Sequence, residues 1–163
     1  MEEVVDLSKV EYVKFERINR GRRNSSVQVL DVGAGFSVDS RATHAIDKGN
    51  SPKGGGSDLP NKRVISNVNY YPRDVDIVKE GLPYSNSKFD KVVSYGAFGW
   101  NFGNIKSAKE LRRVLKVDGN IELGVNKENL KYTVNILKRA GFKDINVEST
   151  PDRPDVFKID AVK

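Results

Sequence analysis

The chain has 163 residues and no cysteine, which excludes a disulfide framework, a thiolate zinc site and a cysteine nucleophile. Its 28 Lys and Arg residues outnumber its 22 Asp and Glu residues, so this basic protein has a net charge of +6 and can attract an anionic partner. No stretch approaches ~18 consecutive apolar residues, and the N-terminus lacks the charged-then-apolar order of a signal peptide. We therefore expect one cytoplasmic domain over residues 1–163, without a membrane span.

The first half of the chain predicts one helix, one loop and four strands. Apolar residues recur at helical spacing among charges over residues 2–20, which predicts an amphipathic helix, and a basic segment follows up to residue 26. Residues 48–62 are rich in Gly, Ser, Pro and Asn and show no periodicity, which predicts a flexible surface loop. The predicted strands are Val27–Val32, Ala42–Asp47, Arg63–Tyr70 and Lys88–Tyr95.

The second half predicts two helices and three strands. An apolar face at helical spacing predicts a helix over Ile105–Lys116, and Asp118-Gly119 predicts the turn that follows it. Another helix is predicted to begin after Asn126, as its N-cap, and to end at Gly141. The predicted strands are Asn120–Val125, Asp144–Thr150 and Val156–Val162.

This alternation of strands and helices predicts an α/β fold with a mainly parallel seven-stranded sheet. The last two strands are separated only by the turn between Pro151 and Pro154, with no helix between them. They must therefore run antiparallel to each other. We expect one antiparallel strand near an edge of the sheet.

The first predicted strand ends in a glycine-containing turn, Asp31-Val32-Gly33-Ala34-Gly35-Phe36. Because Gly33 and Gly35 lack a Cβ, the backbone can bend sharply there and touch a ligand directly. In open α/β sheets, ligands bind beyond the carboxyl ends of the strands. Asp47 ends the next strand sixteen residues after Asp31, where a carboxylate can accept hydrogen bonds from ribose hydroxyls. The spacing therefore predicts a cofactor that contains a nucleoside.

Two features disfavour a dinucleotide cofactor such as NAD. Val38 stands where a dinucleotide-binding turn usually has its third glycine. Only about six residues separate Gly35 from the next strand, too few for a helix whose N-terminus would face a pyrophosphate. A nicotinamide-dependent oxidoreductase is therefore the weaker interpretation, and a cofactor with an amino acid in place of phosphates suits the turn better.

From this turn onward the sequence resembles the class I S-adenosylmethionine-dependent methyltransferases. VQVLDVGAG resembles their first motif, and GLPYSNSKFDKVVS resembles the segment that leads into their fourth strand. SAKELRRVLKVDGNIELGV resembles their next helix, glycine turn and fifth strand, and LKRAGFKDINVE resembles their late helix and sixth strand. The resemblance covers residues 27–163. It implies a Rossmann-like fold, S-adenosyl-L-methionine as cofactor and a transferase that moves a methyl group.

The resemblance implies a set of cofactor-binding residues: Asp31, Gly33, Ala34, Gly35, Phe36, Asp47, Lys48, Asp74, Ser94 and Tyr95. The residues of the first turn would hold the methionine end of the cofactor, and Asp47 would hold its ribose. The adenine would contact Asp74 or, as the alternative, Asp76. Ser94 and Tyr95 would border the sulfonium and the acceptor. The resemblance implies neither a particular catalytic residue nor a metal site.

The acceptor is the least specified part of the prediction. The aromatic run Tyr95, Phe98, Trp100 and Phe102 could stack on a planar or cationic acceptor. The stretch Ser94–Phe98 lacks the Asn/Asp-Pro-Pro-aromatic motif of methyltransferases that act on nucleobase amines. A small molecule is therefore favoured, with an anionic substrate or RNA attracted by the basic segment as the alternative.

Two departures from the family's pattern leave a second function open. The segment after Gly35 is too short for the family's first core helix, and Val78 stands where the family usually has an adenine-binding acid. The alternative is therefore a catalytically inactive binding or interaction module with this fold, including a module of a larger secreted bacterial effector. His44, the only histidine, lies within a predicted strand and is expected to be structural.

Overall fold

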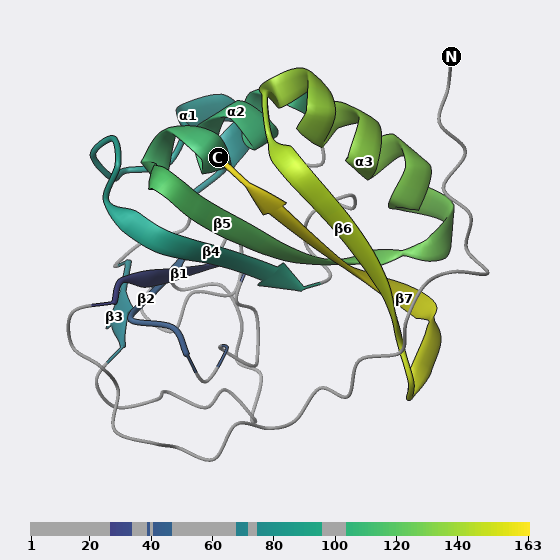
Figure 1. The fold of residues 1–163 in the computed structure, drawn as a ribbon. Helices are drawn as coiled ribbons and strands as arrows, with labels where there is room; N and C mark the ends of the chain where they lie inside the picture. Colours follow the sequence, from purple (N-terminus) through teal and green to yellow (C-terminus); the bar gives the residue numbers. More distant parts are fainter. Residues whose placement is uncertain (1–26, 34–38, 40, 47–67, 72–74, 96–103) are drawn as a thin grey trace.

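The computed structural model describes residues 27–33, 39, 41–46, 68–71, 75–95 and 104–163 (Figure 1). The predicted helix over residues 2–20, the basic segment and the loop over residues 48–62 lie outside these ranges. The elements are β1 (Val29–Val32), β2 (His44–Ile46), β3 (Asn69–Tyr70), α1 (Ile77–Glu80), β4 (Phe89–Tyr95), α2 (Ile105–Val114), β5 (Leu115–Asn126), α3 (Lys127–Ala140), β6 (Lys143–Thr150) and β7 (Arg153–Val162).

The described strands form one seven-stranded sheet in the order β3-β2-β1-β4-β5-β7-β6. The pairs β2–β3, β1–β2, β1–β4 and β4–β5 are parallel. Strand β7 runs antiparallel to both of its neighbours, β5 and β6. The expected α/β fold, with a mainly parallel sheet and one antiparallel strand near the edge, is therefore confirmed.

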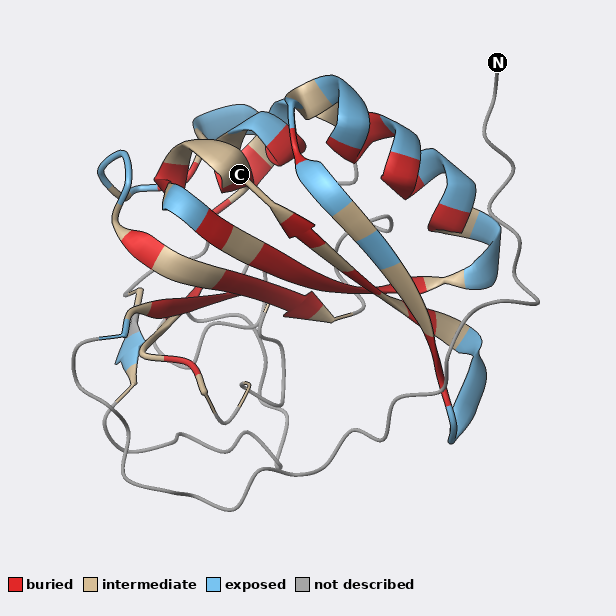
Figure 2. Cartoon of the chain, in the orientation of Figure 1, coloured by how far each residue is buried: buried red, intermediate tan, exposed pale blue. Residues whose placement is uncertain are grey.

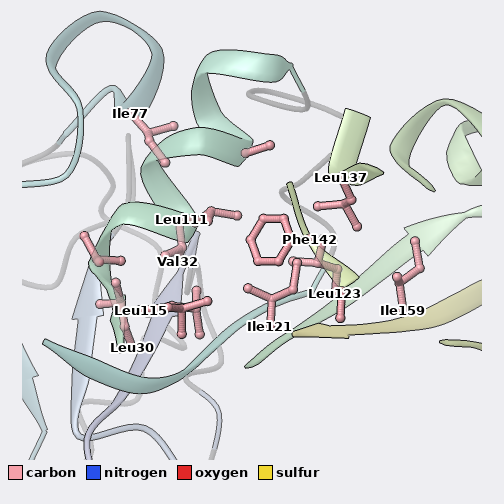
Figure 3. Close-up of a cluster of buried hydrophobic side chains, with 14 of the residues drawn as sticks. Leu30, Val32, Ile77, Leu111, Leu115, Ile121, Leu123, Leu137, Phe142 and Ile159 are labelled. Carbon is pink, nitrogen blue, oxygen red and sulfur yellow. The ribbon is translucent and has the colours of Figure 1, made fainter. Parts of the chain in front are cut away.

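Helices α2 and α3 pack side by side on one face of the sheet, and the buried residues of each helix lie on the side that faces the strands (Figures 1 and 2). Buried residues of both helices and of the strands belong to one hydrophobic core. Each fully buried aliphatic side chain contributes about 1.5–3 kcal/mol to folding. None of the described helices combines the length and apolar character needed to cross a membrane. Figure 3 shows part of this core, with labels on Leu30, Val32, Ile77, Leu111, Leu115, Ile121, Leu123, Leu137, Phe142 and Ile159.

An ion pair within α2, between Glu110 and Arg113, binds the backbone of the segment that precedes β4. Arg113 donates hydrogen bonds to Glu110 and to the carbonyl oxygens of Leu82 and Tyr84, at 2.8–2.9 Å. Glu110 in turn accepts a 2.7 Å hydrogen bond from the backbone N–H of Leu82. The same segment places the Tyr84 ring edge-on against His44, at 6.0 Å between centroids. His44 thus packs among aromatic rings, as a structural residue would.

Helix α3 follows the prediction closely. It ends at Gly141, whose φ of 97° lies in the left-handed region and whose N–H donates to the carbonyl oxygens of Leu137 and Lys138. Asn126 occupies the predicted N-cap position, but its side chain makes no capping hydrogen bond. The side-chain part of the Asn126 prediction is therefore wrong, although the helix begins where it was expected.

The boundary between α2 and β5 differs from the prediction. The helix ends at Val114, and β5 begins immediately at Leu115, before the expected Asp118-Gly119 turn. That dipeptide instead forms an irregularity inside the strand, with Asp118 at a φ of 61°. A Cβ on Gly119 would lie 2.9 Å from the Lys116 carbonyl oxygen, so the bulge needs glycine.

Two further differences concern short elements. Helix α1 was not predicted, because its four residues are too few to show a helical period. The first three strands are shorter than their predicted ranges, in part because Asp47 and residues 63–67 lie outside the described residues. These corrections do not alter the order of the elements along the chain.

Candidate functional site

The strand order reverses between β1 and β4, and this is where an open α/β sheet forms its ligand-binding crevice. The chain proceeds outward from β1 through β2 to β3, and then returns to the other side of β1 to form β4. In open α/β sheets, the segments that follow such a pair of strands diverge and leave room for a ligand between them. Asp31, Gly33, Ser94 and Tyr95 lie at these two strand ends.

Gly33 makes the bend that the sequence predicted. Its φ of 72° lies in the left-handed region, which glycine adopts without a steric penalty. Its N–H donates a 2.8 Å hydrogen bond to the carbonyl oxygen of Ile46 at the end of β2. The bend is thus anchored to the neighbouring strand, and the backbone leaves the sheet at a defined place.

Ser94 joins the two sides of the crevice. Its side chain is fully buried, and its Oγ donates a 2.7 Å hydrogen bond to the carbonyl oxygen of Val32. The bond connects the end of β4 with the end of β1, in addition to the backbone pairing of the two strands.

We expect Ser94→Ala to lower the free energy of unfolding by about 1 kcal/mol, because it removes one buried hydrogen bond. In a thermal melt this corresponds to a fall in Tm of roughly 2–4 °C. The exposed substitution Ser85→Ala serves as the control and should leave the melt unchanged. An unchanged Tm for Ser94→Ala would show that the Ser94 hydrogen bond does not hold the crevice.

Asp31 lies at the end of β1 with its side chain buried. Its Oδ2 accepts a 2.7 Å hydrogen bond from the backbone N–H of Asp39. The carboxylate is thereby oriented by the segment between β1 and β2, next to the Gly33 bend. This is the position that the sequence assigned to the methionine end of a cofactor.

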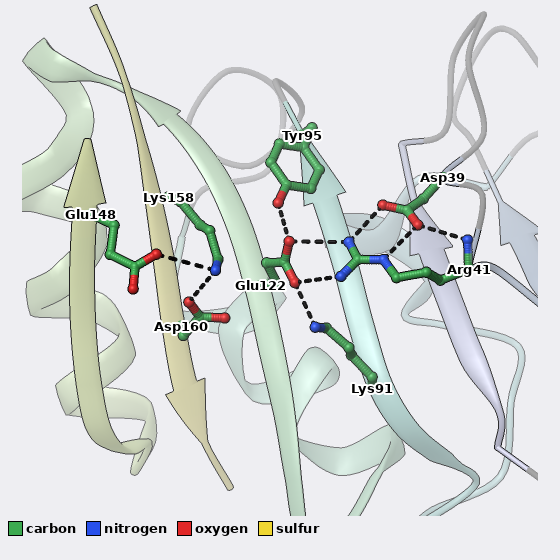
Figure 4. Close-up of polar contacts among 8 residues, drawn as sticks. All are labelled: Asp39, Arg41, Lys91, Tyr95, Glu122, Glu148, Lys158 and Asp160. Carbon is green, nitrogen blue, oxygen red and sulfur yellow. Dashed lines mark hydrogen bonds and ion pairs between the residues drawn. The ribbon is translucent and has the colours of Figure 1, made fainter. Parts of the chain in front are cut away.

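A cluster of charged side chains lies beside this edge, on the sheet face opposite α2 and α3 (Figure 4). At its centre is Glu122 of β5, the one charged residue in the buried stretch 121–125 of this strand. Arg41 donates to both Glu122 oxygens, at 2.9 and 3.0 Å, and Lys91 forms an ion pair at 2.5 Å. The Tyr95 hydroxyl donates a further hydrogen bond to Glu122.

These contacts determine the charge state of the cluster. Burial opposes ionisation of Glu122, but the hydrogen bonds from Arg41, Lys91 and Tyr95 outweigh it and lower the pKa of Glu122 to about 2. Burial, followed by the bond to Glu122, raises the pKa of the Tyr95 phenol. At neutral pH, Glu122 is therefore charged but only weakly basic, and Tyr95 is neutral, so neither suits the role of a general base.

The Tyr95 ring occupies the space left by Gly124 of β5, which has no side chain. A Cβ on Gly124 would lie 2.4 Å from Cδ1 of Tyr95, closer than side-chain atoms approach each other. The ring therefore lies directly against the β5 backbone, while its hydroxyl is held by Glu122. The aromatic ring at the end of β4 has one defined position.

A second ion-pair cluster lies on the same sheet face, on the outer strands β6 and β7 (Figure 4). Lys158 contacts Glu148 at 3.2 Å and Asp160 at 3.0 Å. Asp160 lies directly opposite Glu122 on the adjacent strand, so this cluster adjoins the one around Glu122.

The structure brings together four of the predicted site residues and leaves the others untested. Asp31, Gly33, Ser94 and Tyr95 gather at the crevice. Six predicted residues lie outside the described part of the chain: Ala34, Gly35, Phe36, Asp47, Lys48 and Asp74.

Asp76, the alternative adenine contact, is described and caps α1. Its carboxylate accepts hydrogen bonds from the backbone N–H groups of Val78 and Lys79, at 3.1 and 3.3 Å. Val78 lies within α1 and packs against the core. The Asp76 carboxylate is thus occupied as a helix cap. The contact between an acid and the adenine stays a prediction.

Sequence reasoning missed Asp39, Arg41, Lys91, Glu122 and Gly124. One signal was present in the sequence. Glu122 interrupts the apolar stretch 121–125 at a position that faces away from the helices. Lys91 and Tyr95 lie on the same face of the adjacent strand. Charged residues on matching faces of two neighbouring strands indicate a cross-strand pair.

The fold has close counterparts among solved structures. An S-adenosylmethionine-dependent methyltransferase from Mesorhizobium loti matches with a TM-score of 0.63 and 16% identity, over 88% of this chain and 94% of its own. A possible histamine N-methyltransferase from Thermotoga maritima matches with a TM-score of 0.57 and 16% identity, over 83% of this chain and 82% of its own. Haemonchus contortus phosphoethanolamine N-methyltransferase 2, in complex with phosphomonomethylethanolamine and S-adenosylhomocysteine, matches with a TM-score of 0.59 and 16% identity, over 84% of this chain and 48% of its own.

The chain has the class I methyltransferase fold. No family model and no curated protein matches the sequence, so the likeness rests on structure. The Gly33 bend and the Ser94 bond lie at the carboxyl ends of β1 and β4, the edge at which open α/β sheets bind their ligands. The Tyr95 hydroxyl joins the cluster around Glu122 to the end of β4.

Proposed function

We propose that this protein is an S-adenosylmethionine-dependent methyltransferase that acts on a small molecule. The observation that carries the proposal is the glycine bend after β1, which opens the β1–β4 crevice of a methyltransferase fold. The bend lies next to a buried carboxylate, Asp31, and a carboxylate suits the ammonium of an amino-acid group better than a pyrophosphate. These residues therefore fit the methionine end of S-adenosyl-L-methionine.

The remaining residues have separate roles in the proposed reaction. Asp31 and Gly33 would hold the amino-acid end, and Asp47 would hold the ribose. Ser94 keeps the two strand ends together, and the Tyr95 ring forms a fixed wall at the end of β4. S-adenosyl-L-methionine supplies an activated methyl group, so the protein mainly has to align the acceptor with it.

A small acceptor is favoured by two observations. The matched proteins include a possible histamine N-methyltransferase and a phosphoethanolamine N-methyltransferase, which act on small amines. In addition, the aromatic run that begins at Tyr95 offers rings on which a planar or cationic group could stack. An amine is therefore the first acceptor class to test, and RNA is the second.

Isothermal calorimetry with S-adenosylmethionine and S-adenosylhomocysteine tests the cofactor. We expect a Kd in the micromolar range for the wild-type protein and no measurable binding for Asp47→Ala, because the ribose loses its carboxylate partner. Asp152→Ala, an exposed acid in the turn between β6 and β7, is the matched control and should bind like the wild type. No binding at millimolar cofactor would refute the proposal.

A radiolabelled methyl-transfer assay then separates the remaining possibilities. Transfer to a member of an amine mixture supports the proposed function, and transfer to RNA assigns a macromolecular acceptor instead. Tight cofactor binding without transfer to any acceptor would favour the inactive binding module. Binding of NAD in place of S-adenosylmethionine would support the oxidoreductase interpretation.

A further inference from the structure

An unbroken series of polar contacts runs from the end of β1 to the end of β4. The Asp31 carboxylate accepts from the Asp39 N–H at 2.7 Å, and the Asp39 carboxylate accepts from Arg41 at 2.7 and 2.8 Å. Arg41 then pairs with both oxygens of Glu122, which accepts from the Tyr95 hydroxyl. The series thus connects a residue of the proposed cofactor site with a residue of the proposed acceptor side.

The Arg41–Glu122 pair connects the segment between β1 and β2 with β5, which is not a neighbour of either strand. Arg41 belongs to the segment between β1 and β2, and Glu122 belongs to β5, with β1 and β4 between them in the sheet. The two residues are 81 positions apart in the sequence. The segment that follows the Gly33 bend is therefore held at the sheet face by a contact from its own side chain to a distant strand.

The geometry of the pair restricts its movement. The planar guanidinium of Arg41 makes two parallel hydrogen bonds to Glu122, which is a directional arrangement. With Lys91 and Tyr95 added, Glu122 accepts four donors, about the number that a carboxylate can take. A fully satisfied buried carboxylate has no free position to which its partners could shift.

In most α/β crossovers, a helix holds the segment between two parallel strands against the sheet, by packing apolar side chains on it. The described residues 39 and 41–43 are not helical, and the sheet face beneath them has charged residues at Lys91 and Glu122. A charged brace therefore takes the place that an apolar contact would hold. Unlike an apolar contact, it determines direction as well as distance.

We propose that Arg41 and Glu122 are positioning residues, which hold the Asp31 carboxylate at the end of β1 and the Tyr95 ring at the end of β4 in one fixed arrangement. This inference rests on the proposed function, because it concerns the alignment of that site. Neither residue needs to touch the cofactor. Both act through others: Arg41 through Asp39 and Asp31, and Glu122 through Tyr95.

The test separates positioning from stability. In Arg41→Met/Glu122→Met, both charges are replaced by apolar side chains of similar length, while Asp39 and Lys91 each lose a partner. We expect this variant to melt below the wild-type Tm but to stay folded at the temperature of the binding assay, and to bind S-adenosylhomocysteine about tenfold more weakly, since small misplacements in an aligned site cost one to two orders of magnitude. Arg41→Lys keeps the charge without the planar fork, and should recover part of the lost affinity.

Lys116→Met is the control, because it breaks the ion pair with Asp90 at the start of β4, at the opposite end of this strand from Tyr95. It should leave the Kd for S-adenosylhomocysteine unchanged. If the double variant binds as tightly as the wild type, the positioning role is refuted while the proposed function stands. If the double variant does not fold, Arg41→Lys decides: unchanged affinity refutes the role, and weaker affinity at an unchanged Tm supports it. A wild-type protein that binds no cofactor refutes the proposed function, and the inference with it.

Discussion

Glu122→Gln is expected to lower the free energy of unfolding at pH 7 by about 3 kcal/mol, because removing one partner of a buried charge cluster leaves the others uncompensated. The substitution keeps the shape of the side chain but removes its charge, so Arg41 and Lys91 lose their shared partner. Urea unfolding at pH 7 measures the effect. Glu128→Gln, an exposed substitution on α3, is the control and should stay within about 0.5 kcal/mol of the wild type.

The same variant predicts a specific dependence on pH. The pKa of Glu122 is about 2 in the folded protein, against its usual value of 4.5. A carboxylate with a lowered folded pKa stabilises the protein above its unfolded pKa, and this contribution is lost as the pH falls through the folded value. The stability difference between wild type and Glu122→Gln should therefore be constant above about pH 5 and should shrink between pH 4.5 and pH 2. A difference that does not change over this range would contradict the described charge state.

Gly124→Ala is expected to cost about 1–3 kcal/mol, because the new methyl group overfills a packed site. Its Cβ would lie 2.4 Å from Cδ1 of Tyr95, so the ring must move. Moving the ring breaks the hydrogen bond between the Tyr95 hydroxyl and Glu122. Under the proposed function, cofactor or acceptor affinity falls together with stability.

A double-mutant cycle identifies the cause of that loss. Tyr95→Ala removes the ring, so adding Gly124→Ala to this background should cost much less than it does in the wild type. Chemical denaturation of the four proteins gives the coupling free energy. Equal costs in the two backgrounds would show that the Tyr95 ring does not lie against Gly124.

Several features of the fold were predictable because their causes are local. The apolar period of α3 and the glycine at its end lie within one stretch of sequence, and both were confirmed. The antiparallel arrangement of β6 and β7 followed from the absence of a helix between them. The Gly33 bend was predictable because few other residues adopt its φ.

Other features have causes that are spread along the chain. Helix α1 is too short to show a period, and its N-cap Asp76 has a local role that resembled a ligand-binding one in the sequence. The bulge at Asp118 arises where β5 joins β4, so its form depends on a partner strand. Such features become visible only when the neighbouring element is known.

The sequence by itself determined the seven strands and the two longer described helices in their order, and a glycine bend at the end of the first strand. Only the tertiary structure decided that Arg41, Tyr95 and Glu122 meet, since 81 and 27 positions separate the bonded pairs. The physical reason is that a backbone conformation depends on neighbouring residues, whereas a buried ion pair depends on which strands the fold makes adjacent.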